Sequence, residues 1–220
     1  MINVMTKKSA PPPLPPHKRL RLRWPRLSTI NNILLGLIIV VDLYVILAPM
    51  FPAAAFWWQS HHTHTRQDLT ARLHPAKQPA TKPATVQPNH VIIPSMLLDQ
   101  PILEGPVSQQ YRILDQGIWR WPAGSTPDKG GNTVLIGHRF TYTNPRGVFY
   151  FLNKVAVGDE IGLFWANQEY LYRVSSIAVV PPTQTSIEDA TTDARLTIFT
   201  CTPLWLPKNR LVVVAELERS

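Results

Sequence analysis

The sequence predicts an all-β domain, either a closed barrel or a sandwich, preceded by one apolar segment near the N-terminus. Proline makes up 22 of the 220 residues, about twice the usual share, and it disfavours a mainly helical protein because it breaks helix interiors. Beyond residue 90, short runs rich in β-branched and aromatic residues alternate with Gly, Pro, Asn or Asp, which is typical of strands and turns. A largely apolar stretch covers residues 33–58.

We expect seven or eight strands within residues 91–220. The clearest runs are Val91–Leu98, Tyr111–Trp119, Thr133–Ile136, Asp159–Trp165, Tyr170–Val180, Leu196–Thr200 and Leu211–Leu217. The Gly130-Gly131 pair suits a tight corner, and Gly147–Lys154 suits a short helix. So many short strands in one domain are typical of a barrel or a sandwich.

The net charge of +8 belongs to one end of the chain. Seven of the 22 Lys and Arg residues lie in residues 1–28, which contain no acid, and the other 192 residues carry 15 basic against 14 acidic residues. A nucleic-acid-binding domain would need a basic face on its folded part, so no nucleic-acid partner is expected. We expect residues 1–28 to be a basic, Pro-rich cytoplasmic tail.

The apolar stretch predicts a transmembrane signal-anchor over residues 29–58. A bilayer is crossed by roughly 20 helical residues, and the stretch is long enough. The basic tail places the N-terminus in the cytoplasm, and Trp57 and Trp58 suit the headgroup region at the far side. These features predict a single-pass protein of the cell membrane with an extracellular C-terminal domain.

Two features of the stretch weigh against a membrane anchor. Asp42 in mid-membrane costs about 2.5–3.5 kcal/mol on insertion scales, and Pro49 and Pro52 are expected to end the regular helix early. The alternative is a cleaved signal peptide, with Ala53–Ala55 as a small-residue cleavage site. In both cases the rest of the chain is exported.

Residues 59–90 have the composition of an extracellular stalk or linker. Ala, Thr, Pro and Lys dominate, and no large apolar cluster occurs. His61, His62 and His64 lie close together, but spacing alone does not preorganise a metal site, so a polar stalk is favoured. The folded domain is then expected over residues 91–220.

Three residues of the folded domain have the chemistry of thiolate catalysis. His138 is the one histidine beyond residue 90, Cys201 is the one cysteine of the chain, and each directly follows or ends a strand-like run. Arg210 opens the next run. A thiolate attacks carbonyl carbons, an imidazole moves protons, and a guanidinium can hold an oxyanion. We expect these three side chains to meet in one open groove.

Each of the three residues also has a purely structural reading. A lone cysteine at a strand end is more often part of the core, and a lone histidine or arginine is more often structural or solvated. A free thiol outside the membrane shifts this balance, because oxidation threatens it unless it is buried or functional. One cysteine also excludes an intrachain disulfide and any multi-cysteine zinc or iron–sulfur site, and we expect no cofactor and no metal.

Several motifs occur in an order that points to one family. Arg195–Cys201 carries the cysteine, Gly137–Arg139 carries the histidine, and Ile93–Gly105 opens the domain. Further motifs are Trp121-Pro122, Gly131-Asn132 and Gly158-Asp159. Together they resemble the sortases, the membrane-anchored cysteine transpeptidases of Gram-positive-type cell envelopes, over residues 91–217. The Gly-His-Arg form and the short chain resemble classes C, D or E more than class A.

The resemblance implies a fold, a reaction and partners. The implied fold is a closed eight-stranded β-barrel with short helices. Cys201 would be the nucleophile, His138 the general acid and base, and Arg210 the residue that stabilises the oxyanion and positions the peptide, while Thr200 would help to line the substrate groove. The implied reaction cleaves a C-terminal sorting signal of Leu-Pro-x-Thr-Gly type on a surface protein or pilin. An amine of a peptidoglycan precursor or a pilin lysine then resolves the acyl-enzyme.

The sequence departs from the family pattern in places, and other functions stay open. Trp205 is bulky for the loop between Cys201 and Arg210, no lid helix is evident ahead of the domain, and no acidic cluster supports calcium dependence. One alternative is an exported cysteine endopeptidase that uses water as acceptor. Another is a non-catalytic, membrane-tethered β-barrel that binds a partner, in which Cys201 would be buried and inert.

Overall fold

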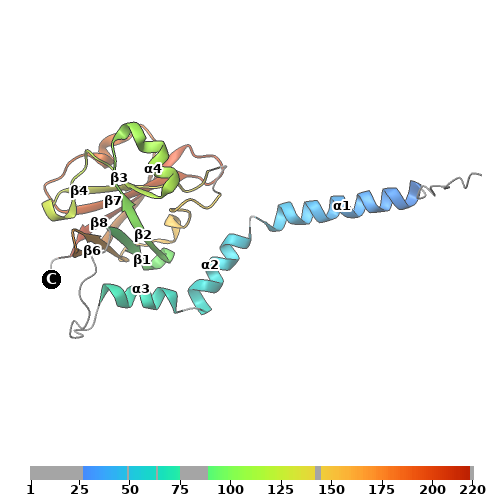
Figure 1. Ribbon diagram of the computed structural model, residues 1–220, viewed down its shortest axis with the longest axis horizontal. Helices are drawn as coiled ribbons and strands as arrows, with labels where there is room; N and C mark the ends of the chain where they lie inside the picture. The colour runs from blue at the N-terminus through green and yellow to red at the C-terminus, as the bar shows by residue number, and fades with distance from the viewer. Residues whose placement is uncertain (1–26, 49, 63, 75–88, 142–144, 219–220) are drawn as a thin grey trace, which may run out of the picture. The chain divides into compact units, whose positions relative to one another are not determined.

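The computed structural model describes residues 27–48, 50–62, 64–74, 89–141 and 145–218 (Figure 1). The chain forms two compact units, divided between Ala54 and Ala55. The predicted basic tail lies outside the described residues, apart from its last two positions.

The first unit contains α1 (Leu27–Leu47), which is long and apolar enough to cross a membrane. A second helix, α2 (Phe51–His62), follows as a separate element, and the division between the two units falls within it. The stretch predicted as one anchor over residues 29–58 thus contains two helices, since α1 ends at Leu47 and α2 begins at Phe51. The remaining 21-residue helix still has the length of a bilayer span.

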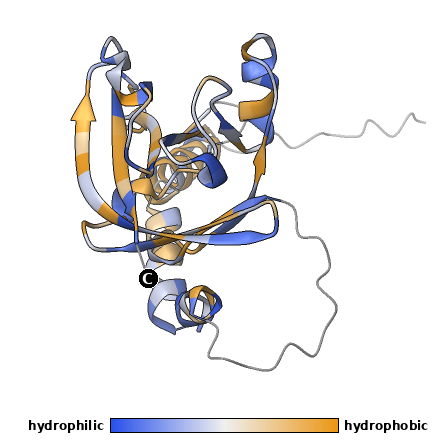
Figure 2. Ribbon diagram, turned by 90° about the vertical axis from the view of Figure 1, so that its left-hand side faces the viewer, coloured by the Kyte–Doolittle hydropathy of each residue, from blue (hydrophilic) through white to orange (hydrophobic). Residues whose placement is uncertain are grey.

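The second unit is a closed barrel of eight strands in the order β1-β2-β3-β4-β7-β8-β6-β5, which confirms the predicted fold. The strands are β1 (His90–Ile93), β2 (Leu98–Leu103), β3 (Ile118–Arg120), β4 (Asn132–Ile136), β5 (Glu160–Trp165), β6 (Gln168–Val180), β7 (Arg195–Thr202) and β8 (Asn209–Leu217). The short helices are α4 (Gln110–Gln116), η1 (Pro94–Met96), η2 (Val107–Gln109), η3 (Pro127–Lys129), η4 (Leu152–Lys154) and η5 (Thr185–Glu188). Apolar and polar segments alternate along the strands in Figure 2.

Three expected elements differ in the structure. The strand expected at Tyr111–Trp119 is wrong, because α4 fills most of it and only β3 is extended. The helix is formed largely by Gln, Arg and Leu, which favour helix, and it buries Ile113. The run Val91–Leu98 is broken into two strands by η1, whose first residue is Pro94. Of the helix expected at Gly147–Lys154, only η4 forms.

Strand β7 is apolar on both faces because each face meets a different cluster. Leu196 and Ile198 belong to the main core inside the barrel. Phe199 belongs to a second cluster on the outer face, together with Val134 and Val212. Since successive side chains of a strand point to opposite faces, Cys201 shares the outer face with Phe199. The outer face of β7 is therefore where the predicted nucleophile lies.

Helix α3 (Thr65–Leu73) lies within the segment for which composition predicts a linker. Its buried residues Leu69 and Leu73 are one helical turn apart and pack with Ile92 of β1. Gly162 of β5 makes room for this contact, since a Cβ there would overlap the Cδ2 atom of Leu73. The segment thus contains a docked helix as well as linker residues, of which residues 75–88 are outside the described part.

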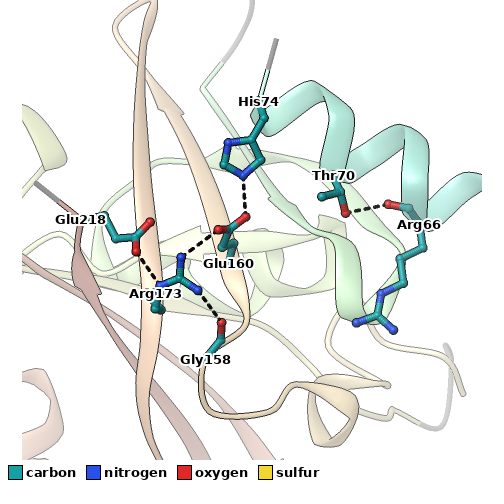
Figure 3. Close-up of polar contacts among 7 residues, drawn as sticks. All are labelled: Arg66, Thr70, His74, Gly158, Glu160, Arg173 and Glu218. Atoms are coloured by element: carbon teal, nitrogen blue, oxygen red, sulfur yellow. Dashed lines mark hydrogen bonds and ion pairs between the residues drawn. The ribbon is translucent and has the colours of Figure 1, made fainter. Parts of the chain in front are cut away.

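An ionic network fixes the chain just after α3 (Figure 3). The Nε2 atom of His74 lies 2.7 Å from Oε2 of Glu160, and Nη2 of Arg173 lies 2.9 Å from the other carboxylate oxygen. Arg173 also donates to Glu218 and to the carbonyl of Gly158. The hydrogen bond from His74, with the charges of His74 and Arg173, holds the pKa of Glu160 below its ordinary value.

The contact between Gly162 and Leu73 predicts how firmly α3 is held. We expect Gly162→Ala to raise amide hydrogen exchange in α3 of the full chain about tenfold, because overpacking a tight contact costs about 1–3 kcal/mol. Adding Leu73→Ala should cancel the effect of the alanine at 162, so that the double variant exchanges no faster than Leu73→Ala alone. Val157→Ala, at an exposed position, is the control and should leave α3 exchange unchanged. Equal exchange in wild type and Gly162→Ala would refute the docked arrangement.

Candidate active site

The parallel pairing of β4 with β7 extends beyond the end of β4. Within the strands, Ile136 is paired with Phe199. The next residue, Gly137, accepts a hydrogen bond of 2.7 Å from Oγ1 of Thr200, and Arg139 donates through Nη1 to Oγ1 of Thr202 at 2.7 Å. All three pairs share one offset of 63 residues. The segment after β4 therefore runs alongside the end of β7.

His138, Cys201 and Arg210 lie on three neighbouring segments at one level. The offset of 63 residues that joins Gly137 to Thr200 and Arg139 to Thr202 places His138 level with Cys201. On the other side of β7, Cys201 is paired directly with Arg210 of β8. We call this arrangement of three residues the Cys201 row. The register thus sets the three residues that the sequence singles out on adjacent segments, although they span more than seventy positions.

Cys201 is an exposed, free cysteine near the end of β7. Desolvation by the surrounding atoms raises the pKa of its thiol above the ordinary value, and the charge of Arg210 acts in the opposite direction. Desolvation is the larger effect, so the sulfur is a neutral thiol at neutral pH before a reactant arrives. A proton acceptor is needed to generate the thiolate.

His138 can be this acceptor because it is neutral. Its side chain is partly buried, and desolvation lowers the pKa of the imidazole, while the charge of Asp115 raises it by a smaller amount. Asp115, near the end of α4, places Oδ1 at 3.7 Å from Nε2 of His138. The backbone is held as well, since the carbonyl of His138 accepts from the amide of Phe149, and a Cβ at Gly147 would overlap that carbonyl.

Arg210 is held by two neighbours. Its Nη1 atom donates to Oε1 of Glu188 at 2.8 Å, and its guanidinium carbon lies 4.9 Å from the centre of the Phe199 ring. The side chain is 24% exposed, so the guanidinium is neither buried in the core nor freely solvated. An arginine in this position has further N–H donors besides the one bound to Glu188.

The resemblance implied that Thr200 would help to line the substrate groove, but the structure buries this residue. The residue is only 2% exposed, and its hydroxyl is committed to the carbonyl of Gly137. The alternation of faces along β7 explains the difference, because exposing Cys201 turns its neighbour inward. Thr200 instead ties the segment that carries His138 to β7.

A cavity of about 490 Å³ opens on the side of His138. His138, Asp115, Arg146 and Tyr150 give it polar walls, whereas Cys201 and Arg210 are not among its lining residues. Of the Cys201 row, His138 is the one member that lines this cavity, so the cavity is not the single groove expected for all three side chains. Trp205 of the loop between β7 and β8 is exposed and meets Phe140, two residues after His138, edge-on, with ring centres 4.5 Å apart.

Sequence reasoning missed three residues that contact the Cys201 row. The sequence predicts a strand at Asp115 and only the start of a short helix at Gly147, and it carries no motif at Glu188, the last residue of η5. The one sequence motif that contacts any of these elements is Gly131-Asn132, because the side chain of Asn132 bonds to the backbone on both sides of Glu188. In the described part of the chain, no group of three or more His, Cys, Asp or Glu residues is placed to hold a metal ion.

Known proteins resemble this chain in sequence and in fold. The family model of the sortase domain matches residues 91–218. Sortase SrtE1 of Streptomyces coelicolor is 26% identical over 221 residues, which cover 91% of this chain and 61% of that protein. Sortase D of Bacillus subtilis is 30% identical over 107 residues, which cover 48% of this chain and 50% of that protein. The chain thus spans less than two thirds of the length of these curated relatives.

Solved structures agree with the sequence matches. Sortase C-1 from Actinomyces oris superposes with a TM-score of 0.53 at 27% identity, over 71% of this chain and 84% of that one. The similar proteins belong to several classes, among them E, D and C, and sortase A of Listeria monocytogenes is 34% identical over 90 residues, 41% of this chain and 40% of that protein. With a family model over more than half of its length and a barrel of the same kind, the chain belongs to the sortase family.

Proposed function

We propose that this protein is a membrane-anchored cysteine transpeptidase in which Cys201 is the nucleophile, His138 the general base and acid, and Arg210 the oxyanion-stabilising group. The observation that supports the proposal is the Cys201 row, in which strand pairing puts Cys201 on a segment between those of His138 and Arg210. The substrate proposed is a sorting signal of Leu-Pro-x-Thr-Gly type on a surface protein or pilin.

The acylation step uses all three members of the row. His138 takes the proton from the thiol as the sulfur attacks the carbonyl carbon of the threonine in the sorting signal. The carbonyl oxygen becomes an oxyanion, which Arg210 stabilises with its charge and its N–H donors. When the tetrahedral intermediate collapses, the C–N bond breaks, and His138 returns its proton to the leaving amine of the glycine. A thioester on Cys201 and a free C-terminal fragment result.

The second step restores the enzyme. An amine attacks the thioester carbon, His138 removes the extra proton from the attacking nitrogen, and the thiolate leaves and is protonated again. The cavity lined by His138 supports this second step, because it offers the incoming amine a place next to the imidazole. We propose a peptidoglycan precursor or a pilin lysine as the amine. If water enters instead, the same site is an endopeptidase.

The location proposed follows from the first unit and the family. Helix α1 fits a single membrane span, and the basic tail ahead of it favours a cytoplasmic N-terminus. The barrel then faces the outside of the cell, where surface proteins and their acceptors meet. The membrane is in this sense a partner of the enzyme.

Mass spectrometry of the full chain in detergent micelles tests the reaction directly. Incubation with a library of sorting-signal peptides is expected to give an acyl adduct on Cys201, which becomes an amide product when triglycine is added. Cys201→Ala should give neither species, and His138→Ala should lower kcat/KM by about 10²–10⁴-fold. Conversion of the adduct only to acid, with every amine tried, would point to the endopeptidase. No adduct with any peptide, together with an unreactive thiol, would point to the non-catalytic barrel.

The pH dependence of thiol alkylation tests the electrostatics of the row. Because the chain has one cysteine, the intact mass after iodoacetamide treatment reports Cys201 alone. We expect alkylation to rise with pH, with a midpoint above that of a free cysteine, since desolvation raises the pKa of the thiol. Arg210→Ala removes a charge that lowers the pKa, so its midpoint should move to still higher pH. Arg210→Lys, which keeps the charge, is the matched control and should move the midpoint less. A midpoint that falls in Arg210→Ala would contradict the assigned neighbourhood.

A further inference from the structure

The guanidinium of Arg210 is fixed by a carboxylate whose own backbone is fixed. Among the residues that the structure describes, Glu188 is the carboxylate that pairs with Arg210, and its side chain is only 18% exposed. The pair forms on the outer face of the barrel, where Phe199 supports the guanidinium. An arginine side chain has several rotatable bonds, and two anchors remove most of its freedom.

Asn132 explains why Glu188 stays in place. The side-chain amide of Asn132 donates to the carbonyls of Ile187 and Asp189, at 3.1 and 3.0 Å, and these residues flank Glu188 on both sides. Asn132 is 1% exposed, and its Oδ1 accepts from the hydroxyl of Thr197 at 2.7 Å. A buried amide whose bonds are all directed in this way holds the loop that contains η5 against β4 and β7.

The contacts therefore form a continuous connection from the barrel to the row. Thr197 holds Asn132, Asn132 holds the loop on either side of Glu188, and Glu188 holds Arg210 beside Cys201. Ile187 adds to this anchoring because it packs against the apolar cluster on the outer face. A carboxylate whose backbone is fixed on both sides can set the position of another group, and it is poorly suited to move away from that group reversibly.

We propose that Glu188 is a positioning residue, which occupies Nη1 of Arg210 and so directs the other N–H donors of the guanidinium toward the carbonyl oxygen of a peptide bound at Cys201. The inference rests on the proposed function, because it concerns how well the oxyanion is stabilised. An interaction realised in the transition state affects kcat more than substrate binding. Glu188 touches neither substrate nor sulfur in this scheme, and acts through Arg210.

Steady-state kinetics of the full chain in detergent micelles, with a sorting-signal peptide and triglycine, tests the proposal. Glu188→Ala is expected to lower kcat about ten- to a hundredfold with a smaller change in KM, because a misplaced catalytic group costs up to about a hundredfold. Glu188→Gln keeps an oxygen acceptor for Nη1 and should recover most of the lost rate. The matched control is Glu104→Ala, which breaks another pair, with Arg120, an arginine also stacked on an aromatic ring but outside the Cys201 row. It should leave kcat unchanged.

Alkylation of Cys201 gives a second readout that needs no turnover. When Glu188→Ala frees Arg210 to leave the sulfur, the midpoint of the pH–alkylation profile should rise toward that of Arg210→Ala, while Glu188→Gln should not raise it. Thermal melting of each variant shows whether the barrel is intact. If the Ala variant does not fold, Glu188→Asp carries the test, because its shorter side chain withdraws the carboxylate from Nη1 of Arg210 and should likewise lower kcat.

Two results would overturn the inference while leaving the proposed function standing. The first is an unchanged kcat in Glu188→Ala while the wild type is active. The second is a higher kcat in Glu188→Ala than in wild type, which would mean that Glu188 restrains Arg210 and lowers the rate. If the wild type shows no activity with any peptide and amine, the proposed function is refuted instead. In that case the alkylation profiles still decide, since an unchanged midpoint in Glu188→Ala would show that Glu188 does not position Arg210.

Discussion

The parallel pairing of β4 with β7 is the constraint on which the site depends. It joins residues 63 positions apart, and it carries the histidine segment to the level of the cysteine. The register is set by burial, because Leu196 and Ile198 must face the core while Phe199 faces the outer cluster. A slip of one residue would turn every side chain of β7 to the opposite face, with Cys201 inside and Thr200 outside. The hydrophobic core thus decides where the thiol points.

Much of the barrel could be predicted because its long strands are built from β-branched and aromatic residues. The runs at β6, β7 and β8 are of this kind, and the structure has strands there. Helix α4 could not be predicted, since Tyr111 and Ile113 suit a strand equally well, and the choice depends on the burial of Ile113 against the rest of the fold. Propensity is a weak prior that tertiary packing overrides.

The candidate site was predictable as residue types and only partly as geometry. His138, Cys201 and Arg210 follow from their chemistry and their places at strand ends. Glu188 and Asp115 contact the Cys201 row from η5 and α4, and the spacing of residues in the sequence does not predict that these elements fold next to the row. The buried state of Thr200 follows from the face that Cys201 occupies, which a motif alone does not reveal. Helix α3 is a similar case, because nine residues are too short to be helical alone and depend on docking through Leu69 and Leu73.

The closed topology also has a consequence for when the thiol becomes reactive. The barrel closes through contacts between segments distant in sequence, among them β1 with β5 and β4 with β7, and such contacts form late because long loops must close first. In a chain that is still unfolded, the cysteine has no imidazole and no guanidinium beside it. The surroundings of Cys201 are therefore acquired only with the finished barrel, and a chain that has not yet folded carries an ordinary thiol.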